Sequence, residues 1–187
     1  NIKIISQSEV DIETECFSES NIENVEIEGS IIKLKERSFD KCINLKTITI
    51  SNSKEIIIDK FTFNECQNLN NITLKASKLN IGENCFENCS SLSTITLINE
   101  SEENLTIPTN VFKGCKSLQT INIRTKSKLI LSNELFSENI KLQRVEITGN
   151  NIQLCDKCFN KSFNKYKPNN IKIISQSEVD IETECFS

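Results

Sequence analysis

The sequence predicts a mostly β solenoid, a stack of about seven coils of 22–27 residues. Two observations predict it: phenylalanine recurs about every 24 residues, and an alternating apolar pair lies on either side of it. The phenylalanines are Phe17, Phe39, Phe63, Phe86, Phe112, Phe136, Phe159 and Phe186. A unit of this length cannot enclose its own apolar face, so it must stack on its neighbours and share their core.

Each repeat is expected to contribute two short strands, because in each apolar pair one residue separates the two members. This period of two places both side chains on one face of a strand. The pair that follows the phenylalanine is Ile48/Ile50, Ile72/Leu74, Ile95/Leu97, Ile121/Ile123 or Val145/Ile147. The pair that precedes it is Val10/Ile12, Ile32/Leu34, Ile56/Ile58, Leu79/Ile81, Leu105/Ile107, Leu129/Leu131, Ile152/Leu154 or Val179/Ile181.

One string of residues carries a family resemblance. Residues 39–50 read Phe-Asp-Lys-Cys-Ile-Asn-Leu-Lys-Thr-Ile-Thr-Ile, and the pattern recurs from Phe63, Phe86 and Phe112. It resembles the unit of the BspA-like leucine-rich repeats over essentially the whole chain. The resemblance implies a curved, right-handed solenoid with one parallel sheet on its concave face and short strands or tight turns opposite. It also implies a surface or secreted protein of bacteria or protists, with a role in adhesion and no enzymatic activity.

Some coils depart from the repeat. Ile22 is expected to take the leucine position in the first coil, which is one residue short. Asn139 and Ser162 stand where cysteine is expected, so packing should differ in those two coils. Three extra residues after Phe159, in a stretch that includes Phe163, Tyr166 and Pro168, predict a bulged coil.

A long duplication suggests a larger array. Residues 1–18 and 170–187 have the same 18 letters, including polar surface positions that packing does not constrain. We therefore expect residues 1–187 to be a single uncapped array, with 1–169 as one seven-coil block and 170–187 as the start of the next identical block. Ile2, Ile4 and Phe186 are candidates for end-to-end stacking, because solenoid ends normally need polar caps. The alternative is that the overlap reflects only where the chain boundaries were placed, which still presupposes the duplication.

Composition argues against several function classes. The net charge is −4 and the 22 basic residues are scattered, so nucleic acid is not an expected partner. The longest uncharged run, Asn88 to Asn99, is much shorter than the ~20 apolar residues of a helical span, so no membrane insertion is expected. There is no His, and the four Gly form no phosphate-binding motif. We expect no cofactor, no metal and no catalytic residue.

The nine cysteines mostly fall into columns. Cys42, Cys66, Cys89 and Cys115 lie three residues after their phenylalanine, whereas Cys16, Cys85, Cys158 and Cys185 directly precede theirs. Buried free thiols are the favoured interpretation, since cysteine is often buried. The alternative is a disulfide between column mates in an oxidising compartment, Cys42 with Cys66 or Cys89 with Cys115. The Cys155-Asp156-Lys157-Cys158 spacing could also indicate zinc binding or redox chemistry, but it lacks a second pair.

The outward positions of the first strands form the candidate binding face. They are Thr47, Thr49, Asn71, Thr73, Thr94, Thr96, Thr120, Asn122, Arg144 and Glu146. The plain interpretation is that β-branched threonine suits exposed strand positions. The functional one is a docking face, because solenoids commonly bind partners on a concave sheet. An ice-binding array of Thr-x-Thr motifs is disfavoured by curvature and by the interruption at Arg144 and Glu146.

These observations favour a non-enzymatic structural or adhesive repeat protein, located outside the cell or at its surface. It would form an extended rod or filament by continuous stacking of its coils. Its expected partners are itself, through end-to-end or lateral assembly, and host or matrix proteins. The alternative is a cell-surface protein-binding module that uses its Thr/Asn face to hold one specific protein.

Overall fold

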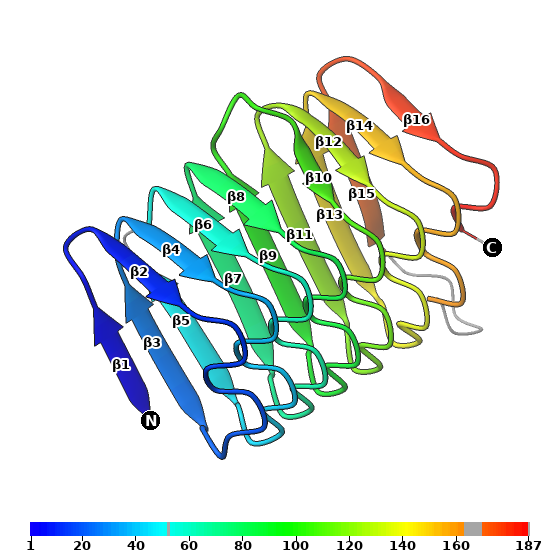
Figure 1. Ribbon diagram of the computed structural model, residues 1–187. Helices are drawn as coiled ribbons and strands as arrows, with labels where there is room; N and C mark the ends of the chain where they lie inside the picture. Colours follow the sequence, from blue (N-terminus) through cyan, green and yellow to red (C-terminus); the bar gives the residue numbers. More distant parts are fainter. Residues whose placement is uncertain (52, 163–169, 187) are drawn as a thin grey trace.

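The computed structural model describes residues 1–51, 53–162 and 170–186, and over these residues it is a stack of parallel β coils with no helix (Figure 1). The first strands of the coils form one eight-stranded sheet. Its strands are β1 (Ile2–Ile5), β3 (Asn24–Glu28), β5 (Thr47–Ser51), β7 (Asn71–Ala76), β9 (Thr94–Asn99), β11 (Thr120–Thr125), β13 (Arg144–Gly149) and β15 (Asn170–Ser175). The predicted β solenoid is confirmed.

The second strands form two four-stranded parallel sheets. One contains β2 (Glu9–Ile12), β4 (Ile31–Leu34), β6 (Glu55–Ile58) and β8 (Lys78–Ile81). The other contains β10 (Leu105–Ile107), β12 (Lys128–Leu131), β14 (Asn151–Leu154) and β16 (Val179–Ile181). The prediction of two strands per repeat is confirmed, and strands such as β7 alternate between exposed and buried residues along their whole length.

The gap between these two sheets coincides with the segment that joins β9 to β10. The backbone N–H of Leu79 in β8 donates to the side-chain carbonyl of Asn99 (3.0 Å) rather than to β10. The Asn99 amide donates in turn to Thr125 Oγ1 (3.3 Å), and both side chains are buried. Side-chain hydrogen bonds therefore replace the backbone hydrogen bonds between strands at this point, because buried polar groups need partners.

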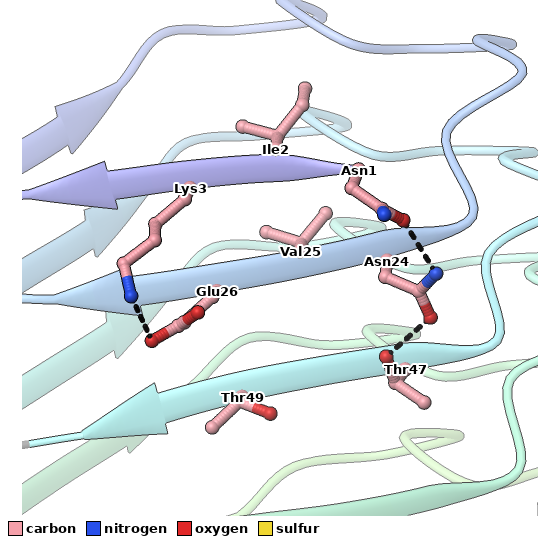
Figure 2. A pocket seen from close by; sticks show the side chains of 8 residues that line it. All are labelled: Asn1, Ile2, Lys3, Asn24, Val25, Glu26, Thr47 and Thr49. Atoms are coloured by element: carbon pink, nitrogen blue, oxygen red, sulfur yellow. Dashed lines mark hydrogen bonds and ion pairs between the residues drawn. The ribbon is translucent and has the colours of Figure 1, made fainter.

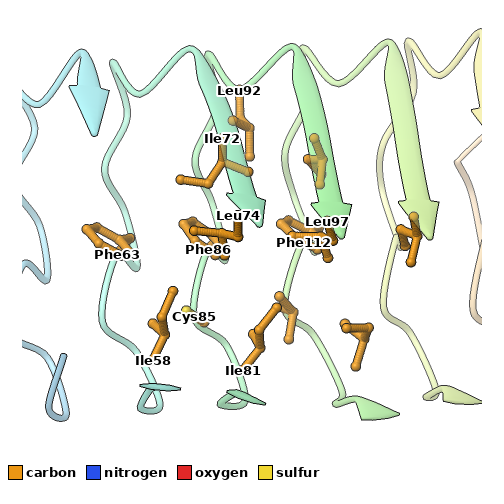
Figure 3. Close-up of a cluster of buried hydrophobic side chains, with 14 of the residues drawn as sticks. Ile58, Phe63, Ile72, Leu74, Ile81, Cys85, Phe86, Leu92, Leu97 and Phe112 are labelled. Atoms are coloured by element: carbon orange, nitrogen blue, oxygen red, sulfur yellow. The ribbon is translucent and has the colours of Figure 1, made fainter. Parts of the chain in front are cut away.

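Phenylalanine forms the centre of the core (Figure 3). Eight rings stack from Phe17 to Phe186, with neighbouring centroids 5.0 to 5.6 Å apart and planes within 22° of parallel. The six inner rings have at most 1% of their surface exposed. The phenylalanine column predicted from the spacing is therefore a continuous ring stack, and its register fixes the register of the strands on either side.

From Phe39 to Phe159, the position three residues after each phenylalanine of the repeat holds a hydrogen-bond donor. Its side chain donates to the carbonyl of the phenylalanine one coil earlier, as Cys66 Sγ does to Phe39 O (3.2 Å) and Cys89 Sγ to Phe63 O (3.1 Å). Asn139 and Ser162 donate to the equivalent carbonyls of Phe112 and Phe136. Amide and hydroxyl groups thus replace the thiol without loss of this hydrogen bond. Packing does differ at Asn139, whose amide also donates to Phe136 O (2.8 Å) and whose buried Oδ1 has no hydrogen-bond partner among the described residues.

Each coil turns through two residues with left-handed backbone conformation, two positions before and two positions after the phenylalanine. Asn84 and Asn88 (φ 56° and 58°) flank Phe86, and Glu134 and Glu138 (φ 55° and 66°) flank Phe136. Only Gly114 (φ 71°) is a glycine among the positions of this kind in the described chain. Asparagine and glycine accept this conformation readily, but most of these turns use residues that do not.

The second copy of the duplicated segment continues the stack in register. β15 pairs with β13, and β16 with β14. The first copy packs instead on the coil that follows it, where β1 pairs with β3 and β2 with β4. Val10 and Ile12 are therefore 6% and 5% exposed, whereas their counterparts Val179 and Ile181 are 40% and 48% exposed. One sequence thus forms a regular coil against a neighbour on either side.

Two smaller expectations also meet the structure. Ile22 is partly buried and packs against the core, in agreement with its assignment to the leucine position. The expected bulge that includes Phe163, Tyr166 and Pro168 lies outside the described residues.

Candidate binding surface

The outward side chains of the eight-stranded sheet form parallel columns. Thr47, Asn71, Thr94, Thr120 and Arg144 are successive partners across the sheet. Beside them, Thr73, Thr96, Asn122 and Glu146 pair in the same way. Thr49 occupies the equivalent position on β5, two residues after Thr47. All ten residues proposed from the sequence thus lie on one face, because each of them alternates with a buried residue of its strand.

The middle of this face carries no charge in these two columns. We call it the Thr/Asn patch: Thr47, Thr49, Asn71, Thr73, Thr94, Thr96, Thr120 and Asn122 on β5, β7, β9 and β11. Five of the eight residues are exposed, and Thr94, Thr96 and Thr120 are half-buried. β-branched threonine keeps the strands extended while it offers both a methyl group and a hydroxyl to solvent.

Most side chains of the patch have no intramolecular hydrogen bond. Thr47 Oγ1 donates to Asn24 Oδ1 (2.7 Å), and Asn24 Nδ2 donates to Asn1 Oδ1 (2.7 Å), which forms a short ladder at one edge (Figure 2). Asn71 Oδ1 accepts from Ser93 (3.1 Å). Within the described chain, the side chains of Thr73, Thr94, Thr96, Thr120 and Asn122 form none. Their polar groups are available to water or to a ligand.

Ion pairs border the patch at both ends. Lys3 Nζ lies 2.9 Å from Glu26 Oε1 on the β1 and β3 side (Figure 2). On the other side, Glu146 lies 3.2 Å from Arg144 and 3.9 Å from Lys172. The hydrogen bond to Glu26 raises the pKa of Lys3 above its usual value. These pairs are exposed to solvent, so they contribute little to stability and mainly define where the uncharged surface ends.

The face is hollowed only shallowly. One open depression is lined by Thr47, Thr49, Asn71 and Thr73 together with two isoleucines, and another by residues of β1, β3 and β5. A third lies at Arg144, Glu146 and their neighbours on β15. Shallow, polar depressions along a sheet suit an extended or flat protein partner more than an enclosed small molecule.

Sequence reasoning missed part of this surface. The two predicted outward positions and the two members of the apolar pair define four positions in each first strand. Strands β7, β9, β11 and β13 have six residues, so a third outward column exists beyond the predicted ones. Lys75, Ile98, Arg124 and Thr148 pair along it. The alternation itself could have revealed this column, because it continues for two more residues in β7, β9, β11 and β13.

The stacking candidates lie elsewhere. Ile2 and Ile4 are half-buried on β1, and Phe186, which is 39% exposed, stacks on Phe159 at a centroid distance of 5.2 Å. The two groups occupy opposite ends of the stack, so they do not meet within the chain (Figure 1).

All nine cysteines are free thiols, and seven of them are buried. Burial raises the pKa of the thiols of Cys66, Cys85 and Cys89 well above the usual range. Buried thiols of this kind stay protonated and are poor nucleophiles. In the part of the chain that the structure describes, no group of three His, Cys, Asp or Glu side chains is arranged to hold a metal ion.

Comparisons with known proteins agree with this geometry. The family model of the BspA type leucine rich repeat region matches in six copies, over residues 10–128, 53–166 and 98–187. The chain belongs to the BspA-type leucine-rich repeat family. A leucine-rich repeat protein from T. pallidum has the same fold, with a TM-score of 0.64 and 18% identity over 91% of this chain and 85% of that chain.

A second similar structure is more distant from this BspA-type chain. It is a leucine-rich cell surface protein from Faecalibacterium prausnitzii, with a TM-score of 0.39 and 16% identity over 94% of this chain and 70% of that chain. No curated protein sequence matches. None of the described residues forms a helix long and apolar enough to cross a membrane.

Proposed function

We propose that this BspA-type chain is a non-enzymatic adhesive protein, located outside the cell or at its surface, that forms an extended rod by continuous stacking of its coils. The rod presents the Thr/Asn patch to protein partners, including other copies of itself and matrix or host proteins. Family membership supports a repeat protein of this type, and the duplicated segment supports the rod.

The observation that carries the proposal is the packing of the two identical segments. The strands of the copy at residues 1–18 pair with the following coil, and the strands of the copy at 170–187 pair with the preceding coil, which leaves Val179 and Ile181 exposed on the open side. Cys16 is exposed in the first copy, whereas the equivalent Cys185 is 1% exposed in the second. A block that ends at residue 169 can therefore be followed by an identical block with no change in strand pairing.

Electron microscopy of the native protein, combined with its intact mass, tests the rod. Seven coils at the ~4.8 Å spacing of parallel strands span about 34 Å. We expect rods whose length is a multiple of that value. Compact particles the size of one block, without end-to-end or lateral assembly, would contradict the rod and leave a single binding module as the better explanation.

Adhesion is tested separately by charge substitution on the sheet. Thr96→Lys places a cation in the centre of the Thr/Asn patch, on a half-buried outward position of β9. Asn80→Lys is the matched control, because Asn80 is an exposed outward residue of β8 in the second row of strands. Adsorption to purified matrix proteins and to immobilised copies of the same chain should fall at least ~10-fold for Thr96→Lys, about 1.4 kcal/mol, and stay unchanged for the control. Equal binding by both variants would exclude the patch.

A further inference from the structure

Three thiols meet where the second copy of the duplicated segment begins to stack. Cys158 directly precedes Phe159, and Cys185 holds the same position before Phe186. The two phenylalanine rings are stacked 5.2 Å apart with planes 5° from parallel, and Phe159 N donates to Cys185 O (2.8 Å). Cys158 and Cys185 are therefore column neighbours on adjacent coils, and both are buried.

The arrangement of these thiols differs from that of the other cysteine column. Cys66, Cys89 and Cys115 each direct Sγ to a phenylalanine carbonyl. No such carbonyl contact occurs for Cys158 or Cys185 among the described residues. The two thiols instead act on each other, because burial and the presence of Cys185 raise the pKa of Cys158 while Cys158 lowers the pKa of Cys185. Neighbouring parallel strands lie ~4.8 Å apart, which falls within the Cα separations of 4.4–6.8 Å that disulfides require.

The third thiol at this place has another partner. Burial, together with the nearby carboxylate of Glu182, raises the pKa of Cys155 to about 11. Cys155 is also the only member of the trio that is not fully buried.

We propose that Cys158 and Cys185 form a disulfide under oxidising conditions and so clamp the coil of the second copy to the coil before it. A low-molecular-weight disulfide such as glutathione disulfide is the oxidant. The two cysteine S–H bonds break, one S–S bond forms between the coils, and the two electrons and two protons leave with the oxidant as two thiol molecules.

Cys16 is the counterpart of Cys185 in the first copy. In a tandem array, Cys16 of each block would meet Cys158 of the block before it, so the clamp would recur at every block junction. This recurrence rests on the proposed function. The pairing of Cys158 with Cys185 does not, because it concerns two residues of the chain described here.

The test is refolding of the fully reduced chain in a glutathione redox buffer, followed by intact mass and peptide mapping. Trypsin separates the three thiols, because Lys157 lies between Cys155 and Cys158. We expect a mass lower by about 2 Da and one cross-link between peptides 158–161 and 173–187. The Cys16 peptide starts after Lys3 and ends at Lys33, so the duplication does not confuse the assignment.

Two variants and one further readout sharpen the experiment. Cys155→Ser should leave the cross-link intact, whereas Cys158→Thr should abolish it; Thr62 fills the same column position in another coil, so the second variant is expected to fold. Amide hydrogen exchange in β16 should slow at least ~10-fold on oxidation of the unmodified chain and not of Cys158→Thr. The pairing would be overturned by a Cys155–Cys158 link, by a glutathione adduct without a cross-link, or by a chain that stays reduced. A cross-link between Cys158 and Cys185 with unchanged hydrogen exchange would overturn the clamp.

Discussion

Replacing one ring of the phenylalanine stack tests how the coils hold together. Phe86 is fully buried between Phe63 (5.2 Å) and Phe112 (5.5 Å), with both pairs of planes within 8° of parallel. Phe→Ala in a core costs about 3–5 kcal/mol, because transfer free energy is lost and a cavity remains. We expect Phe86→Ala to lower the free energy of unfolding by that amount, since the stack cannot close around the gap without disturbing the strand register.

The matched control is Phe17→Ala. Phe17 is partly buried and stacks on one ring, Phe39, at 5.2 Å. In a solenoid, stability is approximately a sum of repeat and nearest-neighbour terms, so a ring with one neighbour should contribute roughly half as much, about 1.5–2.5 kcal/mol. Urea unfolding followed by circular dichroism measures both variants, with the m-value as a check that the same surface unfolds. Equal losses, or a near-neutral Phe86→Ala, would refute the nearest-neighbour reasoning.

Three further predictions concern the turns and the thiols. Cys89→Val removes the donor to Phe63 O, which still accepts from Cys66 N, so the loss should be about 1 kcal/mol in urea unfolding, while Cys89→Ser should lose less. Burial raises the pKa of Cys89 above its ordinary value of 9.0, so unfolding above that pH releases a proton from the thiol. The free energy of unfolding should therefore be unaffected below about pH 8 and should fall as the pH rises past 9, by up to ~1.4 kcal/mol per pH unit for each such thiol. The slope should be shallower in Cys89→Ser. Glu65 has a left-handed φ of 56°, so Glu65→Gly should stabilise the protein by about 0.5–1 kcal/mol. Gly114→Ala should destabilise it, because φ is +71° and the added Cβ would lie 2.4 Å from Asn88 Oδ1. Thermal melting of both variants measures the two effects.

The sequence contains enough information for the coils and for which residues face outward. The phenylalanine spacing and apolar pairs such as Ile72/Leu74 predict the strands, the core and the outward face of the sheet. The reason is that every second residue of such a strand is apolar and buried, while the residues between them are exposed. All ten candidate face residues consequently lie where the alternation places them. Packing of this repetitive kind is local, so one coil predicts the next.

Other features were beyond the reach of residue patterns. At the separation between β8 and β10, the side chain of Asn99 accepts the hydrogen bond from the N–H of Leu79. Residues 99–103 read Asn-Glu-Ser-Glu-Glu, a polar stretch that gives no indication that its first residue is buried. Among the described residues the left-handed turns fall on Glu, Arg or Lys at nine positions and on Asn or Gly at only four, so local propensity does not reveal them. The shared role of Cys89, Asn139 and Ser162 emerges only when their common acceptor is seen.

Charged and uncharged strands alternate along the eight-stranded sheet, and this alternation affects how many patches one partner could engage. In the first two outward columns, β5 to β11 are uncharged, while Lys3, Glu26 and Glu146 put charge on β1, β3 and β13. In the proposed tandem array β15 is the β1 of the next block, so four strands that are uncharged in these two columns would alternate with three charged ones every ~34 Å. A partner that itself repeats at that spacing would engage several patches at once, and weak contacts would then add up to avidity 10²–10⁴ times that of one site.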